Sequence, residues 1–341
     1  MPDRRHILFA VLFMALMGCS ATIKPPGPVI QSAQLDLDHN QLVMADGMAL
    51  PLHAWLPEAG QQPEAPDAVV LAVHGFNDYG AYFKELALHL NKHNIAAYAY
   101  DQRGFGASDN TGYWAGHQAY VSDAVSVLKL IKQRHPDVPV FGFGESMGGA
   151  VLMAASVTKG MKSTLQIDGL ILAAPAVWGR ATMPWYQKAV LWAAVRTVPS
   201  MTLSGRGLKI TPSDNIEMLR ALGRDPLIIK ETRVDALWGV VNLMDRALES
   251  AQNFHTRSLI LYGERDEIIE QQLTKNMLAR LPANPESPRL IATYENGYHM
   301  LIRDLGAKTV WDDILAWIKN PNTRELPSGA EQRRDAFFKG N

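Results

Sequence analysis

Residues 138–149 read Val138-Pro-Val-Phe-Gly-Phe-Gly-Glu-Ser-Met-Gly-Gly149. The first half is a short apolar run of the kind that forms a strand buried on both faces. Glycines and Ser146 follow it, and the apolar residues of 147–159 then recur at helical spacing. A sharp turn from strand to helix exposes the serine at its tip and requires glycines where the backbone is crowded. The stretch therefore predicts a strand, a tight turn that presents Ser146, and a helix.

Similar strand-like and helix-like segments alternate along the rest of the chain. The other short apolar runs span 69–73, 95–100, 170–174, 259–262 and 290–294, and the other helix-like stretches span 82–92, 117–134, 267–281 and 307–319. Regular alternation of this kind predicts an α/β fold with a mostly parallel central sheet flanked by helices. The loose alternation of residues 34–56 around Asp46-Gly47 predicts an antiparallel hairpin at the start of that sheet.

Length and composition bound the class of protein. A chain of 341 residues can form one large α/β domain with an insertion, or two ordinary domains. With 33 basic and 34 acidic residues, the net charge of −1 argues against a nucleic-acid-coating protein and against wholesale disorder. Cys19 is the only cysteine, which excludes an intramolecular disulfide and a thiolate metal cluster.

One connection is much longer than the others. Residues 177–256 separate the apolar run that ends at Ala174 from the run that starts at Leu259. A gap of that length inside a compact domain is usually functional, so it predicts an inserted helical cap within a domain spanning 34–320. Residues 321–341 are polar with scattered charge and are expected to form a surface tail.

Chemistry-bearing residues follow the predicted strands, where ligands bind in an open α/β sheet. The run 259–262 leads into Gly263-Glu-Arg-Asp266, and the run 290–294 leads to Gly297-Tyr-His299. The chain order Ser146, Asp266, His299 is the order of hydrolases with a strand-to-helix nucleophile turn. We expect His299 to accept the proton of Ser146 and Asp266 to orient the imidazole. Glu264 and Glu267 remain rival acids.

A site for the oxyanion is also predicted. His74-Gly75-Phe76 comes directly after the first long apolar run, where a backbone N–H is needed. We assign the oxyanion hole to the backbone N–H groups of Phe76 and Met147. His74 is not interpreted as the catalytic base.

With these residues in place, the chain resembles the α/β hydrolases of the monoacylglycerol lipase and lysophospholipase type, which are grouped with the serine aminopeptidases. The matching features cover most of residues 40–320 and are His74-Gly75 with Tyr82, Asp101-Gln-Arg-Gly-Phe-Gly-Ala-Ser108, Gly144-Glu-Ser-Met-Gly-Gly149, Asp225-Pro-Leu227, Gly263-Glu-Arg-Asp266 and His299. The resemblance implies the α/β-hydrolase fold and structural roles for Asp101 and Arg103. The enzyme is expected to need no metal or organic cofactor. Glu85, His89 and His93 follow one another at intervals of four on a predicted helix and could line up as metal ligands, but we interpret them as a polar helix face.

The first part of the predicted cap is basic and aromatic. Residues 177–213 contain five Lys or Arg residues and no acidic one, together with Trp178, Trp185 and Trp192. Trp185, Lys188, Trp192 and Arg196 share one helical stripe, which suits either an interfacial helix on an anionic surface or a helix packed onto the core. In both cases we expect the tryptophans to supply apolar lining. An acyl ester is favoured over a peptide, because no acidic cluster is present to receive an amino terminus.

The N-terminus has the pattern of a targeting segment. Arg4 and Arg5 precede the apolar run 7–17, which is too short to span a bilayer and has the length of a signal-peptide core. Leu16-Met-Gly-Cys19 resembles the lipobox of bacterial lipoproteins, which implies removal of residues 1–18 and acylation of Cys19. Residues 19–33 would then form a tether, and Ser20 resembles the outer-membrane sorting pattern. The alternative is a cytoplasmic protein with an incidental cysteine.

The predicted function is hydrolysis of monoacylglycerol or lysophospholipid esters through an acyl-enzyme on Ser146. The expected partners are a lipid ester and a membrane surface, without nucleic acid, and the oligomeric state is left open. Two alternatives remain: a short-chain carboxylesterase or thioesterase, and a catalytically silent fold that serves as a lipid-binding lipoprotein.

Overall fold

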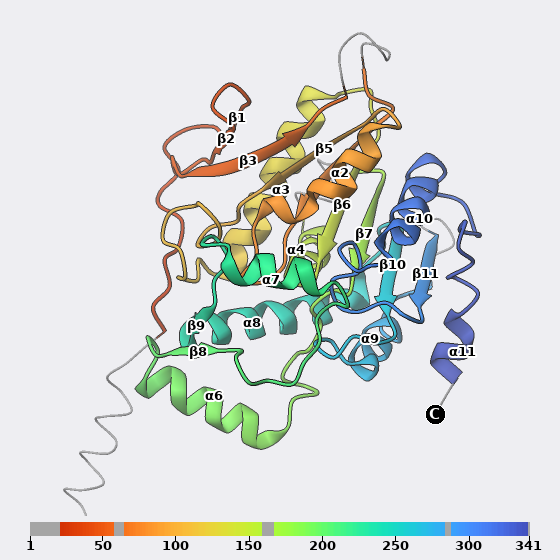
Figure 1. The fold of residues 1–341 in the computed structure, drawn as a ribbon. Helices are drawn as coiled ribbons and strands as arrows, with labels where there is room; N and C mark the ends of the chain where they lie inside the picture. Colours follow the sequence, from red (N-terminus) through yellow and green to blue (C-terminus); the bar gives the residue numbers. More distant parts are fainter. Residues whose placement is uncertain (1–20, 58–64, 159–166, 284–287, 340–341) are drawn as a thin grey trace, which may run out of the picture.

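In the part of the chain that the structure describes, nine strands form one central sheet (Figure 1). The computed structural model describes residues 21–57, 65–158, 167–283 and 288–339. The strand order is β1-β2-β3-β5-β4-β6-β7-β10-β11. The strands are β1 (Gln34–Asp36), β2 (Gln41–Val43), β3 (Ala49–Trp55), β4 (Ala68–Val73), β5 (Ile95–Tyr100), β6 (Val140–Glu145), β7 (Gly169–Ala173), β10 (Ser258–Gly263) and β11 (Arg289–Tyr294).

The sheet is parallel from β5 to β11 and antiparallel at its first edge. The predicted hairpin is present, since β2 and β3 pair antiparallel around Gly47, which has the positive φ of 82° that such a turn favours. β1 extends this edge as a third antiparallel strand. These pairings confirm the predicted α/β-hydrolase fold with a mostly parallel sheet.

Helices cover both faces of the sheet. They are η1 (Gly80–Phe83), α2 (Lys84–Asn91), α3 (His117–Arg134), α4 (Met147–Ser156), α9 (Gln271–Leu278), α10 (Ala307–Lys319) and α11 (Arg334–Lys339). Successive residues of β4 point to opposite faces, so Leu71 joins the apolar cluster that includes α3 and α4. Val70 and Ala72 join the cluster formed with α2 and α10. This two-sided burial explains why the strands read as uninterrupted apolar runs.

The long connection between β7 and β10 folds as a cap over the sheet. It contains α6 (Trp185–Thr197), β8 (Thr202–Ser204), α7 (Ile216–Arg224), β9 (Glu231–Arg233), α8 (Val234–Ser250) and η2 (Ala251–Asn253). α8 packs against α4 and α3, and α6 packs against α8. The antiparallel pair β8 and β9 was not predicted, because three-residue strands are too short to show a period.

Both ends of the described chain differ from the sequence expectation. Residues 22–31 are hydrogen-bonded to the body of the protein rather than forming a free tether. The expected polar surface tail instead covers the edge strand β11. Leu326, Ala330 and Phe337 are buried, the Thr293 N–H donates to the Ala330 carbonyl, and Phe337 packs on Tyr262. The unpaired backbone groups of an exposed edge strand can pair with another chain and cause aggregation, and this segment covers them.

The predicted signal segment 1–18 and the acylation site Cys19 lie outside the described residues. Within the described ranges, no helix has the length and apolar character needed to cross a membrane.

Candidate active site

The turn at Ser146 has the strained geometry that the sequence predicts. β6 ends at Glu145, α4 begins at Met147, and Ser146 between them has φ 52° and ψ −115°. A side chain on Gly148 would approach the carbonyl oxygen of Val73 to 1.9 Å, and one on Gly144 would meet the backbone of residue 148 at 2.6 Å. Such close approaches leave room only for glycine. A non-glycine residue held at positive φ is typical of a functional constraint.

The sheet register places the predicted oxyanion loop beside this turn. β4 and β6 are neighbours, with Val73 opposite Gly144. A Cβ built on Gly75 would lie 3.5 Å from the Cβ of Ser146. Gly75 is therefore next to the serine, and Phe76 is the residue that follows it. Met147 is the first residue of α4, and its N–H therefore has no partner within the helix. These are the two N–H groups that the sequence assigns to the oxyanion.

Asp266 and His299 are brought together by the pairing of β10 with β11, in which Gly263 lies opposite Tyr294. The Nδ1 of His299 lies 2.8 Å from Oδ2 of Asp266. The other oxygen, Oδ1, accepts the backbone N–H groups of Ile268 and Ile269 at 2.8 and 2.9 Å. Both side chains are buried. The carboxylate is thus fixed from one side and orients the imidazole from the other.

The rival acids have other partners. Glu264 pairs with Arg333 through both of its oxygens. Glu267 accepts the N–H of Thr211 at 2.7 Å. Of the three acids considered for the base-orienting role, only Asp266 contacts His299.

His74 has both ring nitrogens engaged. Nδ1 donates to the carbonyl oxygen of Gly75 at 2.7 Å, and Nε2 accepts the N–H of Gln102 at 3.0 Å. Burial lowers the pKa of His74, which favours the neutral ring that this pattern requires. His74 therefore holds the loop before Phe76 against the loop that follows β5, and neither ring nitrogen is available to Ser146.

The electrostatics of His299 predict a pH profile. Burial alone would lower its pKa, but the charge and hydrogen bond of Asp266, with a contribution from Glu145, raise the pKa above the usual 6.5. A general base works only when neutral, so activity falls as the pH drops through this pKa. We expect kcat/KM for a soluble ester to rise with pH through a single titration centred above 6.5.

Circular dichroism over the same pH range provides the control, because the fold must persist where activity is lost. A profile that is flat from pH 5 to 8, the range in which histidines commonly titrate, would count against His299 as the base.

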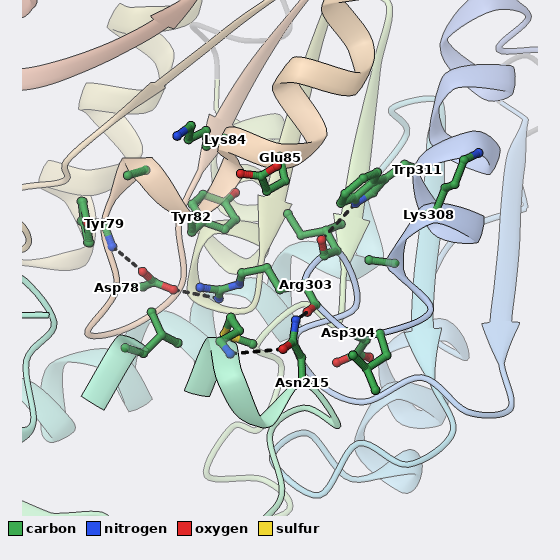
Figure 2. A pocket seen from close by; sticks show the side chains of 16 residues that line it. Asp78, Tyr79, Tyr82, Lys84, Glu85, Asn215, Arg303, Asp304, Lys308 and Trp311 are labelled. Atoms are coloured by element: carbon green, nitrogen blue, oxygen red, sulfur yellow. Dashed lines mark hydrogen bonds and ion pairs between the residues drawn. The ribbon is translucent and has the colours of Figure 1, made fainter. Parts of the chain in front are cut away.

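A buried arginine behind the site was not predicted. Arg303, four residues after His299, pairs with Asp78 at 2.8 Å and with Glu145 at 3.1 Å. Arg303 lines a cavity of about 450 Å³ between η1, α7 and α10. Figure 2 shows its guanidinium turned toward Asp78. Burial raises the pKa of Glu145, and Arg303 opposes that rise. Arg303 thus links the loops that carry Phe76, Ser146 and His299. The only signal of this partner in the sequence is Glu145, a charged residue at the end of a buried strand, which requires a countercharge.

Replacing Arg303 with methionine is expected to lower the free energy of unfolding by about 3–5 kcal/mol, because Glu145 and Asp78 would remain buried without a countercharge. Chemical denaturation measures the change. The matched control is Arg220→Met, which removes an exposed pair with Glu217 and should change stability by at most about 1 kcal/mol. Equal effects of the two substitutions would show that the buried network does not stabilise the fold.

The cap is hydrogen-bonded directly to the oxyanion loop. The Asn77 side-chain amide donates to Oγ1 of Thr232 at 2.6 Å, and the Asn77 carbonyl accepts the N–H of Ile229 at 3.1 Å. The hydroxyl of Tyr79 donates to Asp225 at 2.8 Å. Asn77 has φ 64°, which asparagine tolerates better than most residues. The sequence motif at 225–227 matched the family, but its contact with Tyr79 is visible only in the fold.

The tryptophans of the cap do not share one environment. Trp178 is half-buried against the core cluster of α4 and α8. Trp185 and Trp192 are 77% and 45% exposed on α6. Exposure of that size does not fit side chains that line an enclosed acyl site or pack a helix onto the core, so the lining prediction is revised for these two residues.

The other sequence candidates have structural roles. Asp101 accepts the backbone N–H groups of Gly80 and Ala107, and Arg103 pairs with Asp46 and Asp123. His89 lies 3.1 Å from Asp312. Within the described ranges, no cluster of three or more His, Cys, Asp or Glu residues is placed to hold a metal ion.

Comparison with known proteins agrees with this architecture. Rat monoglyceride lipase is 26% identical over 291 residues, covering 84% of this chain and 91% of that protein. The crystal structure of Paleococcus ferrophilus monoacylglycerol lipase matches with a TM-score of 0.64 and 23% identity, covering 81% of this chain and all of that chain. A soluble variant of monoglyceride lipase from Saccharomyces cerevisiae matches with a TM-score of 0.68 and 18% identity, covering 89% and 99%.

The family model described as serine aminopeptidase S33 matches residues 64–306, which is most of the chain and includes Phe76, Ser146, Asp266 and His299. This chain belongs to the serine aminopeptidase S33 family of α/β hydrolases.

Proposed function

We propose that this protein hydrolyses monoacyl lipid esters, with monoacylglycerol as the substrate class, through an acyl-enzyme on Ser146. The observation that carries the proposal is the buried His299–Asp266 pair at 2.8 Å, which lies at the same edge of the sheet as the strained turn of Ser146. Relatives named monoglyceride lipase align over most of this chain, which supports the substrate class.

The reaction divides into two half-reactions. The Oγ of Ser146 attacks the ester carbonyl carbon, and its proton passes to Nε2 of His299, the nitrogen opposite the one that faces Asp266. The N–H groups of Phe76 and Met147 stabilise the oxyanion. When the tetrahedral intermediate collapses, the carbon–oxygen bond to glycerol breaks and His299 returns the proton to the leaving alcohol. Water then repeats the sequence on the acyl-enzyme and releases the fatty acid.

A panel of substrates tests the specificity. Wild type and Ser146→Ala are compared on monoacylglycerols of increasing chain length, a diacylglycerol, a lysophospholipid, a short soluble ester and an aminoacyl amide. We expect the highest kcat/KM on long-chain monoacylglycerol and an almost complete loss of activity in the variant. Faster cleavage of the aminoacyl amide would overturn the ester assignment. A rate that falls steadily with chain length would instead identify a short-chain esterase or thioesterase.

We further propose that Cys19 is acylated and attaches the protein to a bacterial membrane, the outer membrane in a cell that has two. The support is the sequence pattern of residues 4–20 together with the exposed apolar residues of the cap. Cells fed radiolabelled palmitate should label the wild type and the control Ser20→Ala, but not Cys19→Ser. Equal labelling of Cys19→Ser would refute this attachment.

A further inference from the structure

The first described residues are held to the body of the protein over most of their length. We name residues 22–31 the N-terminal clamp. The Thr22 N–H donates to Oδ2 of Asp235 at 3.2 Å, Ile23 forms a β-bridge with Trp114, and the Lys24 N–H donates to the Trp114 carbonyl at 2.8 Å. Further along, the Gly27 N–H donates to Asp46 at 3.0 Å and the Ile30 N–H donates to Ala45 at 2.9 Å.

The partners of the clamp are themselves firmly held. Trp114 is buried against α8, where it contacts Gly239. The side chain of Asp235 is fully buried and is paired with Arg233, and Asp46 is paired with Arg103. Because these groups are fixed by ion pairs and packing, the clamp binds to a rigid surface.

Asp235 also connects the clamp to the end of α6. Its backbone N–H donates to the Pro199 carbonyl at 3.0 Å, and the N–H of Val234 donates to the Met201 carbonyl at 2.9 Å. Pro199 and Met201 lie in the segment that joins α6 to β8. Figure 1 shows the first described residues of the clamp beside β8 and β9. Cys19 is three residues before Thr22 in the sequence, and a segment of that length spans at most about 11 Å when fully extended.

That same region bears an exposed apolar and basic surface, which we name the cap face. Most of the large apolar side chains that are exposed in the described ranges belong to it: Trp185, Tyr186, Val190, Trp192, Val198, Met201, Leu203, Leu208 and Ile210. The cations Lys188, Arg196, Arg206 and Lys209 belong to the same stretch, and residues 185–213 contain no acidic residue. One acid of a neighbouring strand reaches this surface, since Glu231 of β9 accepts the hydroxyl of Thr202. The guanidinium of Arg196 stacks on the ring of Trp192 at 4.2 Å.

A surface of this composition fits the interface of an anionic bilayer. Aromatic and aliphatic side chains enter the region between headgroups and acyl chains, and lysine and arginine bind the headgroup phosphates. Exposed apolar side chains that occur this densely, with cations in the same stretch, are typical of a site of interaction.

We propose that the N-terminal clamp holds the acylated Cys19 beside the cap face, so that the anchor and the cap face bind the same bilayer and fix the orientation of the enzyme. The proposal rests on the acylation of Cys19 proposed above. We name the segment between Cys19 and Thr22 the leash. A short leash gives the cap face a high effective concentration at the membrane, whereas a free tether of the same composition would leave the orientation of the enzyme unfixed.

Two variants distinguish a clamp from a free tether. Each carries the same inserted Gly/Ser linker of about ten residues, at a different position. Placed after Ser20, the linker lengthens the leash between the anchor and the clamp. Placed after Ser32, it lies between the clamp and β1 and leaves that leash unchanged. A free tether would respond equally to both insertions, because both add the same length between Cys19 and the sheet.

The measurement is hydrolysis of monoacylglycerol embedded in vesicles of phosphatidylcholine and phosphatidylglycerol by the full acylated protein. We expect the insertion after Ser20 to lower this rate several-fold and the insertion after Ser32 to leave it near that of wild type. Both variants should keep wild-type activity on a short soluble ester. Equal effects of the two insertions, or no effect of either, would overturn the proposal that the clamp fixes the orientation of the enzyme.

A fluorescent label reports the orientation independently. Acylation consumes the only cysteine of the chain, so a cysteine introduced at another position can be labelled selectively. An environment-sensitive dye on Val190→Cys in α6 should shift to the blue on the same vesicles, and this shift should shrink with the insertion after Ser20. The control Leu88→Cys, on α2 and away from α6 in Figure 1, should not shift. A label on Val190→Cys that stays in water would contradict the proposal.

The failures of the separate proposals can be told apart. Missing palmitate on wild-type protein would remove the anchor and the clamp proposal with it, while the activity on a soluble ester would still report the hydrolase. An acylated protein without soluble-ester activity would contradict the proposed catalysis and leave the orientation measurable by the label.

Discussion

Ser146→Ala is expected to lower kcat/KM for an ester substrate by about 10⁶-fold, because no other group takes over the attack on the carbonyl carbon. The substitution removes one oxygen and keeps the Cβ, so the turn at φ 52° and its glycine contacts are unchanged. Steady-state hydrolysis of a soluble ester and of a long-chain monoacylglycerol measures the loss. Thermal unfolding checks that the variant folds as wild type does.

Ser126→Ala is the matched control. Its hydroxyl donates to the Ser122 carbonyl on the exposed side of α3, and its removal should leave activity unchanged. If Ser146→Ala kept more than about a hundredth of the wild-type activity, a path of hydrolysis that does not use this serine would be required.

Asp266→Asn is expected to lower kcat/KM by about 10⁴-fold through the wrong imidazole tautomer. The two backbone N–H groups of Ile268 and Ile269 select an oxygen at the position of Oδ1. The asparagine NH₂ must then face Nδ1 of His299, which becomes an acceptor, and the ring proton moves to Nε2. In that tautomer His299 cannot accept the proton of Ser146.

The pH profile distinguishes this effect from a general loss of structure. Without the charge of Asp266, which raises the pKa of His299, the residual activity of Asp266→Asn should titrate at a lower pH than that of wild type. The control Glu264→Gln breaks an exposed pair with Arg333 and should keep both the rate and the profile. Wild-type activity in Asp266→Asn would return the orienting role to another acid.

The sequence predicts the sheet and the three candidate catalytic residues because each depends on local pattern. Ser146 is at the end of a strand whose glycines and apolar residues are adjacent in sequence, and Asp266 and His299 follow their strands within a few residues. Parallel register then aligns these strand ends, as the pairing of Gly263 with Tyr294 shows. The choice of Asp266 over Glu264 and Glu267 needed the hydrogen bonds of the folded loop.

The features that sequence did not predict rest on contacts between distant residues. Arg303 meets Glu145 across 158 positions, and Thr22 meets Asp235 across 213, so no periodicity links them. The same holds for Asn77 and Thr232, which join the oxyanion loop to the cap. The sequence of the C-terminal segment predicts a tail because its apolar residues, among them Leu326 and Phe337, are few, and its hydrogen bond with Thr293 and its ion pair with Glu264 leave no local pattern.

The proposed hydrolysis depends on the covalent step at Ser146, and labelling with a fluorophosphonate tests that step directly. Wild-type protein and Ser146→Ala are incubated with the probe, digested and examined by peptide mass spectrometry. We predict a single modified peptide in wild type, with the probe on Ser146, and no modification in Ser146→Ala. A folded wild type that takes up no probe, or a probe found on another residue while Ser146→Ala still hydrolyses esters, would contradict it.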